Sequence, residues 1–232
     1  MIDLHTHTLF SDGELLPSEL VYRAKVKGYK AIALTDHADF SNLDFLIPRV
    51  IKIAKILTSE YEIIVIPGIE LTYVPPNLIA QAVKKIRSYK KDGGIKLILV
   101  HGETTAEPVP PGTNRAAILA KVDILAHPGL ISEEDCQLAK GNNVYLELTS
   151  RKLHRVTNGY LAKLAKKNGA KLIFNTDAHQ PEDIVSDKEA ENILKLVDMD
   201  KNFVELQNNA KELISIHGKK FSTQRIKKRS TR

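Results

Sequence analysis

The spacing of short apolar segments is the feature that most constrains the fold of this chain. Seven such segments alternate with stretches in which apolar residues recur at helical spacing. They cover residues 2–4, 30–34, 62–66, 96–100, 123–126, 144–148 and 171–175. Strands that alternate with helices pair in parallel, and their sheet is covered on both faces, so each strand is apolar throughout. The sequence therefore predicts an α/β fold with seven parallel strands.

Several intervening helices have recognisable ends. Pro17 opens one that stops at Gly28, and Asn168-Gly169 closes another, because glycine adopts the left-handed cap conformation. Ser132 and Asp135 resemble a capping box for a helix that ends before Gly141. Two more helices are expected over 186–197 and 200–216. No repeat or interdomain linker interrupts this pattern, so we expect one domain.

Polar residues that bind metals follow nearly every apolar segment. The groups are His5-Thr6-His7 with Ser11-Asp12-Gly13, Thr35-Asp36-His37, Gly68-Ile69-Glu70, His101, His127-Pro128-Gly129 and Asp177-Ala178-His179. Six of the eight histidines thus stand at the carboxyl ends of predicted strands, the end at which βα barrels build active sites. The two members of an H-x-H or D-x-H pair point to the same side of a strand and can reach one ion.

The ligand types restrict the ion. The single cysteine, Cys136, cannot provide a thiolate site, so nitrogen and oxygen must hold the metal. Imidazole with carboxylate suits zinc, manganese or iron, whereas calcium and magnesium prefer oxygen alone. Each residue alone has a structural alternative: a turn for Asp12, a rim hydrogen bond for His101 or His127. Their common position favours a metal centre, and His154 and His217, in helical stretches without partners, are predicted to be surface residues.

Together these motifs resemble the PHP family, the polymerase and histidinol phosphatase domain, over residues 1–179. Within it the chain is most similar to stand-alone histidinol-phosphatase-like members. The resemblance implies a distorted seven-stranded (β/α)7 TIM-like barrel with three divalent transition-metal ions. It places His5, His7, Glu70 and Asp177 on one ion, and Glu70, His101 and His127 on a second. Asp12, His37 and His179 would hold the third.

The implied activity is a metal-dependent phosphoesterase, most simply a phosphomonoesterase for a small phosphorylated metabolite. Catalysis would depend on Glu70, Asp177 and His179, with Asp177 or a water near His179 protonating the leaving group. Arg151, and more weakly Arg115, are candidates to grip phosphate. Asp36 is the expected partner that orients a ligand histidine.

Other interpretations stay open at this stage. A nuclease or nucleotide phosphodiesterase would use the same centre, and a non-catalytic interaction module would keep the barrel without the chemistry. An amidohydrolase-type barrel also begins with H-x-H, but it has eight strands and a modified lysine after the fourth, where this chain has His101.

The net charge of +6 is concentrated at one end of the chain. Residues 218–232 carry seven Lys and Arg and no acid, which leaves 27 basic against 28 acidic residues elsewhere. We expect residues 1–217 to form the barrel with its last helices, and 218–232 to be a disordered basic tail. The lack of a signal sequence or long apolar run predicts a cytoplasmic protein without a membrane partner. Nucleic acid is the less favoured partner, and the oligomeric state is not predicted.

Overall fold

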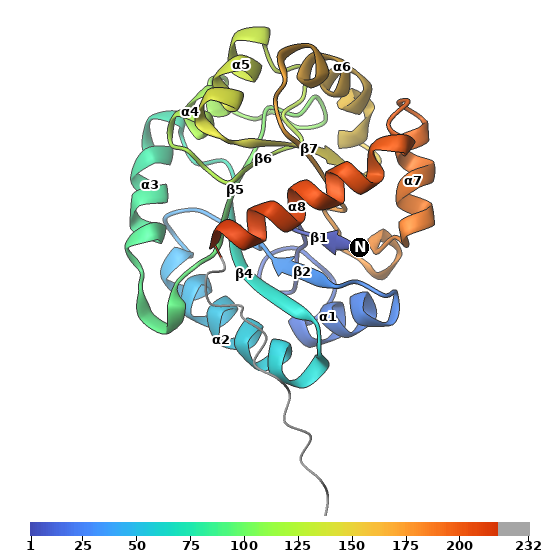
Figure 1. Cartoon of the computed structure of the whole chain (residues 1–232). Helices are drawn as coiled ribbons and strands as arrows, with labels where there is room; N and C mark the ends of the chain where they lie inside the picture. The colour runs from blue at the N-terminus through green and yellow to red at the C-terminus, as the bar shows by residue number, and fades with distance from the viewer. Residues whose placement is uncertain (218–232) are drawn as a thin grey trace, which may run out of the picture.

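The computed structural model describes residues 1–217, and seven parallel strands in it form a nearly closed barrel (Figure 1). They are β1 (Ile2–Asp3), β2 (Ala31–Leu34), β4 (Ile64–Leu71), β5 (Leu97–His101), β6 (Ile124–Ala126), β7 (Tyr145–Thr149) and β8 (Leu172–Asn175), each paired with the next. A parallel bridge between Thr6 and Ala178 joins the first and last strands. The predicted α/β class and seven-stranded barrel are confirmed.

The third barrel strand runs five residues beyond its predicted end at Ile66. Pro67-Gly68 has the composition of a turn, yet both residues lie inside β4. Gly68 is required there, because a Cβ would come within 2.6 Å of Cγ2 of Thr35, the residue just after β2. The extension lets a two-residue strand, β3 (His37–Ala38), pair with β4 and sets His37 opposite Glu70.

Eight α-helices lie within the described residues. They are α1 (Pro17–Val26), α2 (Leu43–Tyr61), α3 (Pro76–Ser88), α4 (Thr113–Leu119), α5 (Glu133–Asn142), α6 (Asn158–Asn168), α7 (Asp187–Lys195) and α8 (Phe203–His217). Gly169 caps α6 in the left-handed conformation, as predicted. Ser132 caps α5, but that helix continues through Gly141, and Asn143 takes the left-handed cap position.

The core has two layers, inside and outside the barrel wall. The inner layer consists of small and branched residues of the strands, among them Leu4, Ala33 and Leu99. Helix α8 crosses the amino-terminal end of the barrel and contributes Ala210 and Leu213 to this layer (Figure 1). The outer layer packs the remaining helices against the strands. One end of the barrel is therefore closed by a helix, and function is left to the other end.

None of the helices in residues 1–217 is long and apolar enough to span a membrane. The predicted basic tail, 218–232, lies outside the described residues.

Candidate metal centre

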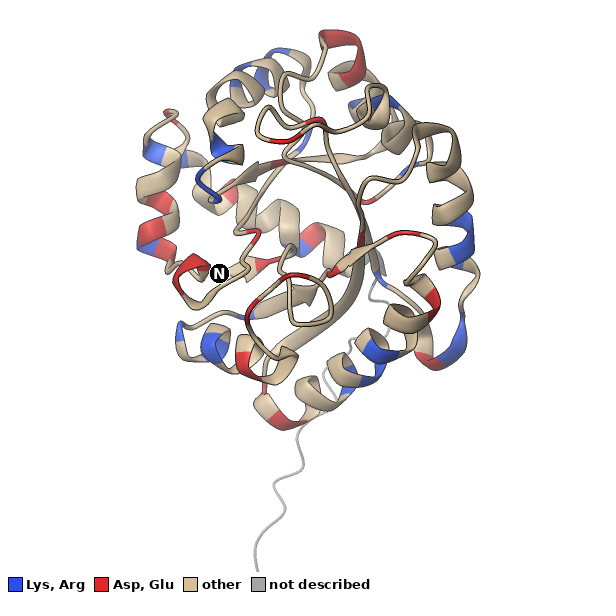
Figure 2. Cartoon of the chain, turned by 180° about the vertical axis from the view of Figure 1, so that it is seen from behind, with Lys and Arg blue, Asp and Glu red and all other residues tan. Residues whose placement is uncertain are grey.

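The carboxyl ends of the strands carry the predicted metal ligands, opposite α8. Figure 2 views this end, where acidic segments lie around the barrel mouth and most basic residues lie on the outer helices. The nine predicted ligands are His5, His7, Asp12, His37, Glu70, His101, His127, Asp177 and His179. Six of them are buried, His37 and His179 are partly buried, and Asp12 is exposed; these last three line the pocket described below. The fold brings all nine to one end of the barrel.

The first group of ligands surrounds His5 and His7. The Nε2 atoms of His5 and His7 lie 3.0 Å apart. Glu70 Oε2 lies 3.3 Å from Nε2 of His5 and 3.5 Å from Nε2 of His7. Asp177 Oδ1 lies 3.2 Å from His7 Nε2 and 3.6 Å from His5 Nε2. Ligand atoms about 2.1 Å from a common ion lie about 3 to 3.5 Å apart, so these spacings match one coordination shell.

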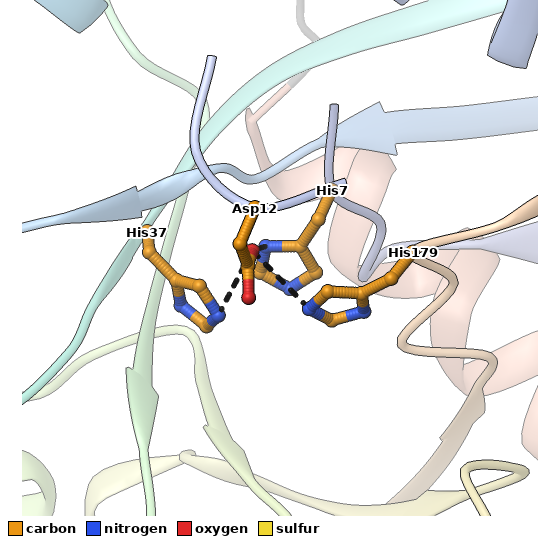
Figure 3. A group of neighbouring side chains, drawn as sticks. All are labelled: His7, Asp12, His37 and His179. Atoms are coloured by element: carbon orange, nitrogen blue, oxygen red, sulfur yellow. Dashed lines mark ion pairs between the residues drawn. The ribbon is translucent and has the colours of Figure 1, made fainter. Parts of the chain in front are cut away.

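The second group surrounds the carboxylate of Asp12, as Figure 3 shows. Asp12 Oδ1 lies 3.4 Å from His179 Nε2 and 3.6 Å from His37 Nε2, with His7 Nδ1 at 4.0 Å. The Nδ1 atoms of the two outer rings have other partners: His37 Nδ1 lies 2.7 Å from Glu70 Oε2, and His179 Nδ1 lies 2.9 Å from the Asp177 carbonyl oxygen. Both Nδ1 atoms are thus engaged on the far sides of the rings, and the two Nε2 atoms face Asp12.

The third group contains a histidine that the sequence did not indicate. His101, His127 and His154 each offer a nitrogen within 4.8 Å of the others, and all three are buried. His127 Nε2 also lies 3.9 Å from Glu70 Oε1. The prediction that His154 is a surface residue is wrong, because the short 3-10 helix His154–Thr157 after β7 turns its ring into the barrel mouth. His217 ends α8, and its side chain lies outside the described part of the chain.

Glu147 on β7 orients one of the predicted ligands. Its two carboxylate oxygens each lie 3.0 Å from His5 Nδ1, which leaves Nε2 to face the first group. The prediction gave this kind of role to Asp36. Asp36 instead accepts hydrogen bonds from the Thr8 amide, the Thr8 hydroxyl and the Ser11 hydroxyl, so it fixes the loop that carries Asp12.

The electrostatics of the centre favour the ligand forms of Glu70, His7 and Asp12. At His5 and His37, burial is outweighed by the surrounding carboxylates, which raise the pKa of both rings, so a cation bound there would replace a proton. Burial opposes ionisation of Glu70, but His5 and His37 outweigh it and hold the pKa of Glu70 well below its ordinary value. Burial and the neighbouring His37 and His179 lower the pKa of His7, so its imidazole is neutral. Burial also raises the pKa of Asp12, but His179 and His37 outweigh this effect and lower the pKa to about 2.

Two further observations indicate that cations complete this site. Both oxygens of Glu70, Asp177 Oδ1 and His7 Nδ1 are buried without a hydrogen-bond partner, which is costly unless a cation compensates. The backbone of His127 and Asp177 has φ of 27° and 55°, a conformation that non-glycine residues rarely adopt. Strain at two predicted ligands is typical of a functional site, so the donor set fits divalent metal ions.

A cavity of about 490 Å³ opens directly above the centre. It is lined by Asp12, His37, His101, Asp177 and His179, by Arg151 and His154, and by residues of the β3–α2 and β4–α3 loops. Arg151 Nη1 lies 2.7 Å from His179 Nδ1, and Nε lies 3.7 Å from Asp177 Oδ2. Nη1 also donates to the Asp177 carbonyl oxygen at 3.3 Å and lies 3.7 Å from Asp183 Oδ2, so the guanidinium is held on the cavity wall beside the predicted ligands.

Arg115, the other predicted phosphate residue, lies elsewhere. It belongs to α4 and does not line the cavity, and its Nε donates to Asp135 Oδ1 on α5 at 2.7 Å. The helix turns this side chain away from the barrel mouth, so we no longer assign it a role in binding phosphate.

Comparison with known proteins agrees with this fold and site. The PHP domain family model matches residues 3–212, and the chain belongs to the PHP family. An uncharacterized protein of Methanocaldococcus jannaschii is 50% identical over 194 residues, which cover 82% of this chain and 87% of that protein. A protein of Shewanella pealeana named "probable phosphatase" is 30% identical over 225 residues, with 85% of each chain covered.

The same fold occurs in a solved structure of distant sequence. A chain in the cryo-EM structure of archaeal ribonuclease P with mature tRNA matches with a TM-score of 0.71. The match covers 98% of this chain and 100% of that one at 18% identity, so it supports the fold alone.

Proposed function

We propose that this PHP-family hydrolase, a metal-dependent phosphoesterase, removes phosphate from small phosphorylated metabolites. The observation that carries the proposal is the environment of Glu70. Its buried carboxylate lies within 4 Å of nitrogens of His5, His7, His37 and His127, yet neither oxygen has a hydrogen-bond partner. A fully buried anion in this setting is best explained by cations on both of its oxygens.

Three divalent ions of zinc, manganese or iron are the proposed cofactors. Such ions would bind the phosphoryl oxygens and lower the pKa of an attacking water. We assign Glu70 to a bridging position between the group of His5, His7 and Asp177 and that of His101 and His127. Asp177 and His179 line the cavity, and we propose that one of them protonates the leaving oxygen directly or through a water.

The size and charge of the cavity favour a small substrate. Its 490 Å³ suits a metabolite, and Arg151 is the one Lys or Arg among its lining residues. Asp39 and Glu107 lie on its wall and would repel the continuous phosphate chain of a nucleic acid. Relatives named "probable phosphatase" support the same class of reaction.

The direct test is phosphate release by the manganese- or zinc-loaded protein. Histidinol phosphate is the first of a panel of phosphomonoesters, tested beside a cyclic nucleotide and single-stranded oligonucleotides. We expect turnover of one or more monoesters and little of the others. Faster cleavage of oligonucleotides than of every monoester would contradict the proposal, and no metal-stimulated turnover at all would favour a non-catalytic module.

Arg151 can be tested against a matched arginine. Arg151→Ala removes the positive charge on the cavity wall, and we expect KM for the phosphomonoester to rise about 10-fold. Arg115→Ala removes an equal charge outside the cavity and should leave KM unchanged. Equal KM values for the two variants would exclude Arg151 from phosphate binding.

A further inference from the structure

Three side chains surround one carboxylate beside the metal centre. The Tyr73 hydroxyl donates to Glu107 Oε2 at 3.2 Å, and His101 Nε2 lies 3.4 Å from the same oxygen. His154 Nε2 lies 3.6 Å from Glu107 Oε1. All four residues line the cavity above the predicted ions. The carboxylate of Glu107 therefore occupies an anion-binding place in the substrate cavity.

The tautomer of His154 makes it a donor toward this place. Its Nδ1 lies 2.7 Å from the Thr104 hydroxyl, and that hydroxyl oxygen already accepts from the Ala106 amide. When Thr104 donates its hydroxyl hydrogen to Nδ1, the imidazole proton lies on Nε2 and can be donated to an anion. His154 is also stacked on His127, with ring centroids 4.2 Å apart and planes at 13°. His154 thus lies beside His127 with its Nε2 3.6 Å from Glu107 Oε1, where it can meet an anion of the substrate.

Glu107 is held at this place by few other interactions. It is carried by the proline-containing loop between β5 and α4, and its side chain is 40% exposed. Its carboxylate contacts are with Tyr73, His101 and His154 alone among the residues described. Tyr73 faces it from the β4–α3 loop with φ of 54°, a strained conformation for an aromatic residue. An incoming anion can therefore replace Glu107 without breaking the fold.

We infer that Tyr73 and His154 form an anion subsite for a phosphate group of the substrate, and that Glu107 occupies it in competition with the substrate. This inference rests on the proposed function, since it names a second binding element of the same site. Glu107 is then a specificity residue: it weakens binding of phosphate ligands that make few other contacts.

The test is the affinity of the zinc-loaded full chain for inorganic phosphate, measured by calorimetry beside the metal content of each variant. Glu107→Gln and Glu107→Ala remove the competing charge, and we expect the Kd for phosphate to fall about 3- to 10-fold with the metal content unchanged. Glu191→Gln, on the outer face of α7, removes an equal charge and should not alter Kd. Tyr73→Phe, placed in the Glu107→Gln background, should weaken phosphate binding by a similar factor.

Three results would overturn the inference. Weaker phosphate binding by both Glu107 variants would make Glu107 part of the binding machinery. Loss of metal would make it a ligand, and a Kd equal to that of Glu191→Gln would mean that it does not compete. The proposed function is tested by separate results. If the Glu107 variants bind phosphate more tightly but the protein hydrolyses no ester, the subsite is supported and the proposed function is not. If the protein hydrolyses phosphomonoesters but the Glu107 variants have an unchanged Kd, only the subsite is rejected.

Discussion

The two ends of the barrel contrast sharply although the same seven strands reach both. At the amino-terminal end, α8 seals the interior with Ala210 and Leu213 against apolar strand residues. At the other end, the interior becomes a buried cluster of imidazoles and carboxylates; along the chain, this change occurs just after β1, between Leu4 and Thr6. Several of those polar atoms have no hydrogen-bond partner, and among the described residues no buried side-chain atom of α8 is left in this state.

This difference shows how the molecule divides stability from function. Burial of apolar surface at the α8 end contributes folding free energy, because Ala210 and Leu213 pack against apolar strand residues there. The centre costs folding free energy until cations compensate its charges. Substitutions at the two ends should therefore have separable effects on unfolding and on metal binding.

The largest effect should come from Glu70→Gln. The change keeps the shape of the side chain but removes the charge that we place between two ions. We expect kcat to fall roughly 1000-fold or more, with loss of bound metal. Metal analysis by mass spectrometry and the phosphate-release assay measure both. A variant with full metal content and activity would show that Glu70 is not a bridging ligand.

At the opposite end, Leu213→Ala opens a cavity under α8. We expect the free energy of unfolding to decrease by about 2–5 kcal/mol, while the folded protein keeps its metal content. Val204→Ala is the matched control, since Val204 lies on the same helix and is exposed. Chemical denaturation gives the values, and a loss of metal in folded Leu213→Ala would show that the two ends are coupled.

Substitution of Glu147 tests how much its contact with His5 contributes to metal binding, while His5 itself stays in place. Glu147→Ala leaves His5 Nδ1 without its acceptor, so we expect metal affinity to fall about 10- to 100-fold. Glu147→Gln retains an acceptor oxygen and should lose less. A competition titration with a chelator measures the affinities, and equal values for both variants and the wild type would remove this orienting role.

The smallest effect concerns a surface site that belongs to neither end. Glu189 caps α7 through Ser186, and its backbone and hydroxyl hydrogen bonds lower the pKa of the carboxyl to about 2. Because this pKa is lower in the folded protein than in the unfolded chain, where it is near 4.5, the carboxylate stabilises the fold at pH values above 4.5. This contribution is lost as the pH falls toward 2. Glu189→Gln should reduce the free energy of unfolding by less than about 1 kcal/mol at pH 7, since the site is exposed. The difference in the free energy of unfolding between Glu189→Gln and the wild type should decrease below pH 4.5. A difference that stays constant with pH would show that the pKa of Glu189 is not lowered in the folded protein.

The parts of this structure that were predictable follow from burial on both faces of the sheet. Most residues of the barrel strands are apolar, and most of the predicted ligands are polar residues close to the carboxyl ends of these apolar runs. His5, His37 and His101 were found in this way. Strand ends were less predictable: Pro67-Gly68 has turn composition, and its place inside β4 depends on the close approach of Thr35.

Two residues of the site, Glu147 and His154, were not predicted from the polar residues that follow apolar runs. Glu147 lies inside an apolar run, and the signal was present: a single carboxylate between Leu146 and Leu148 must find a buried partner. His154 follows β7 by five residues in a short helix, and only tertiary structure turns its ring inward. The number of residues between a side chain and the preceding strand therefore does not predict whether that side chain reaches the site when a loop folds back over the barrel mouth.

The account depends on cations held by this polar end of the barrel. Anomalous diffraction from crystals of the manganese-loaded protein tests it most directly. We predict peaks between His5, His7, Glu70 and Asp177, beside His101 and His127, and between Asp12, His37 and His179. Crystals soaked in manganese that show no anomalous peak among these side chains would contradict it.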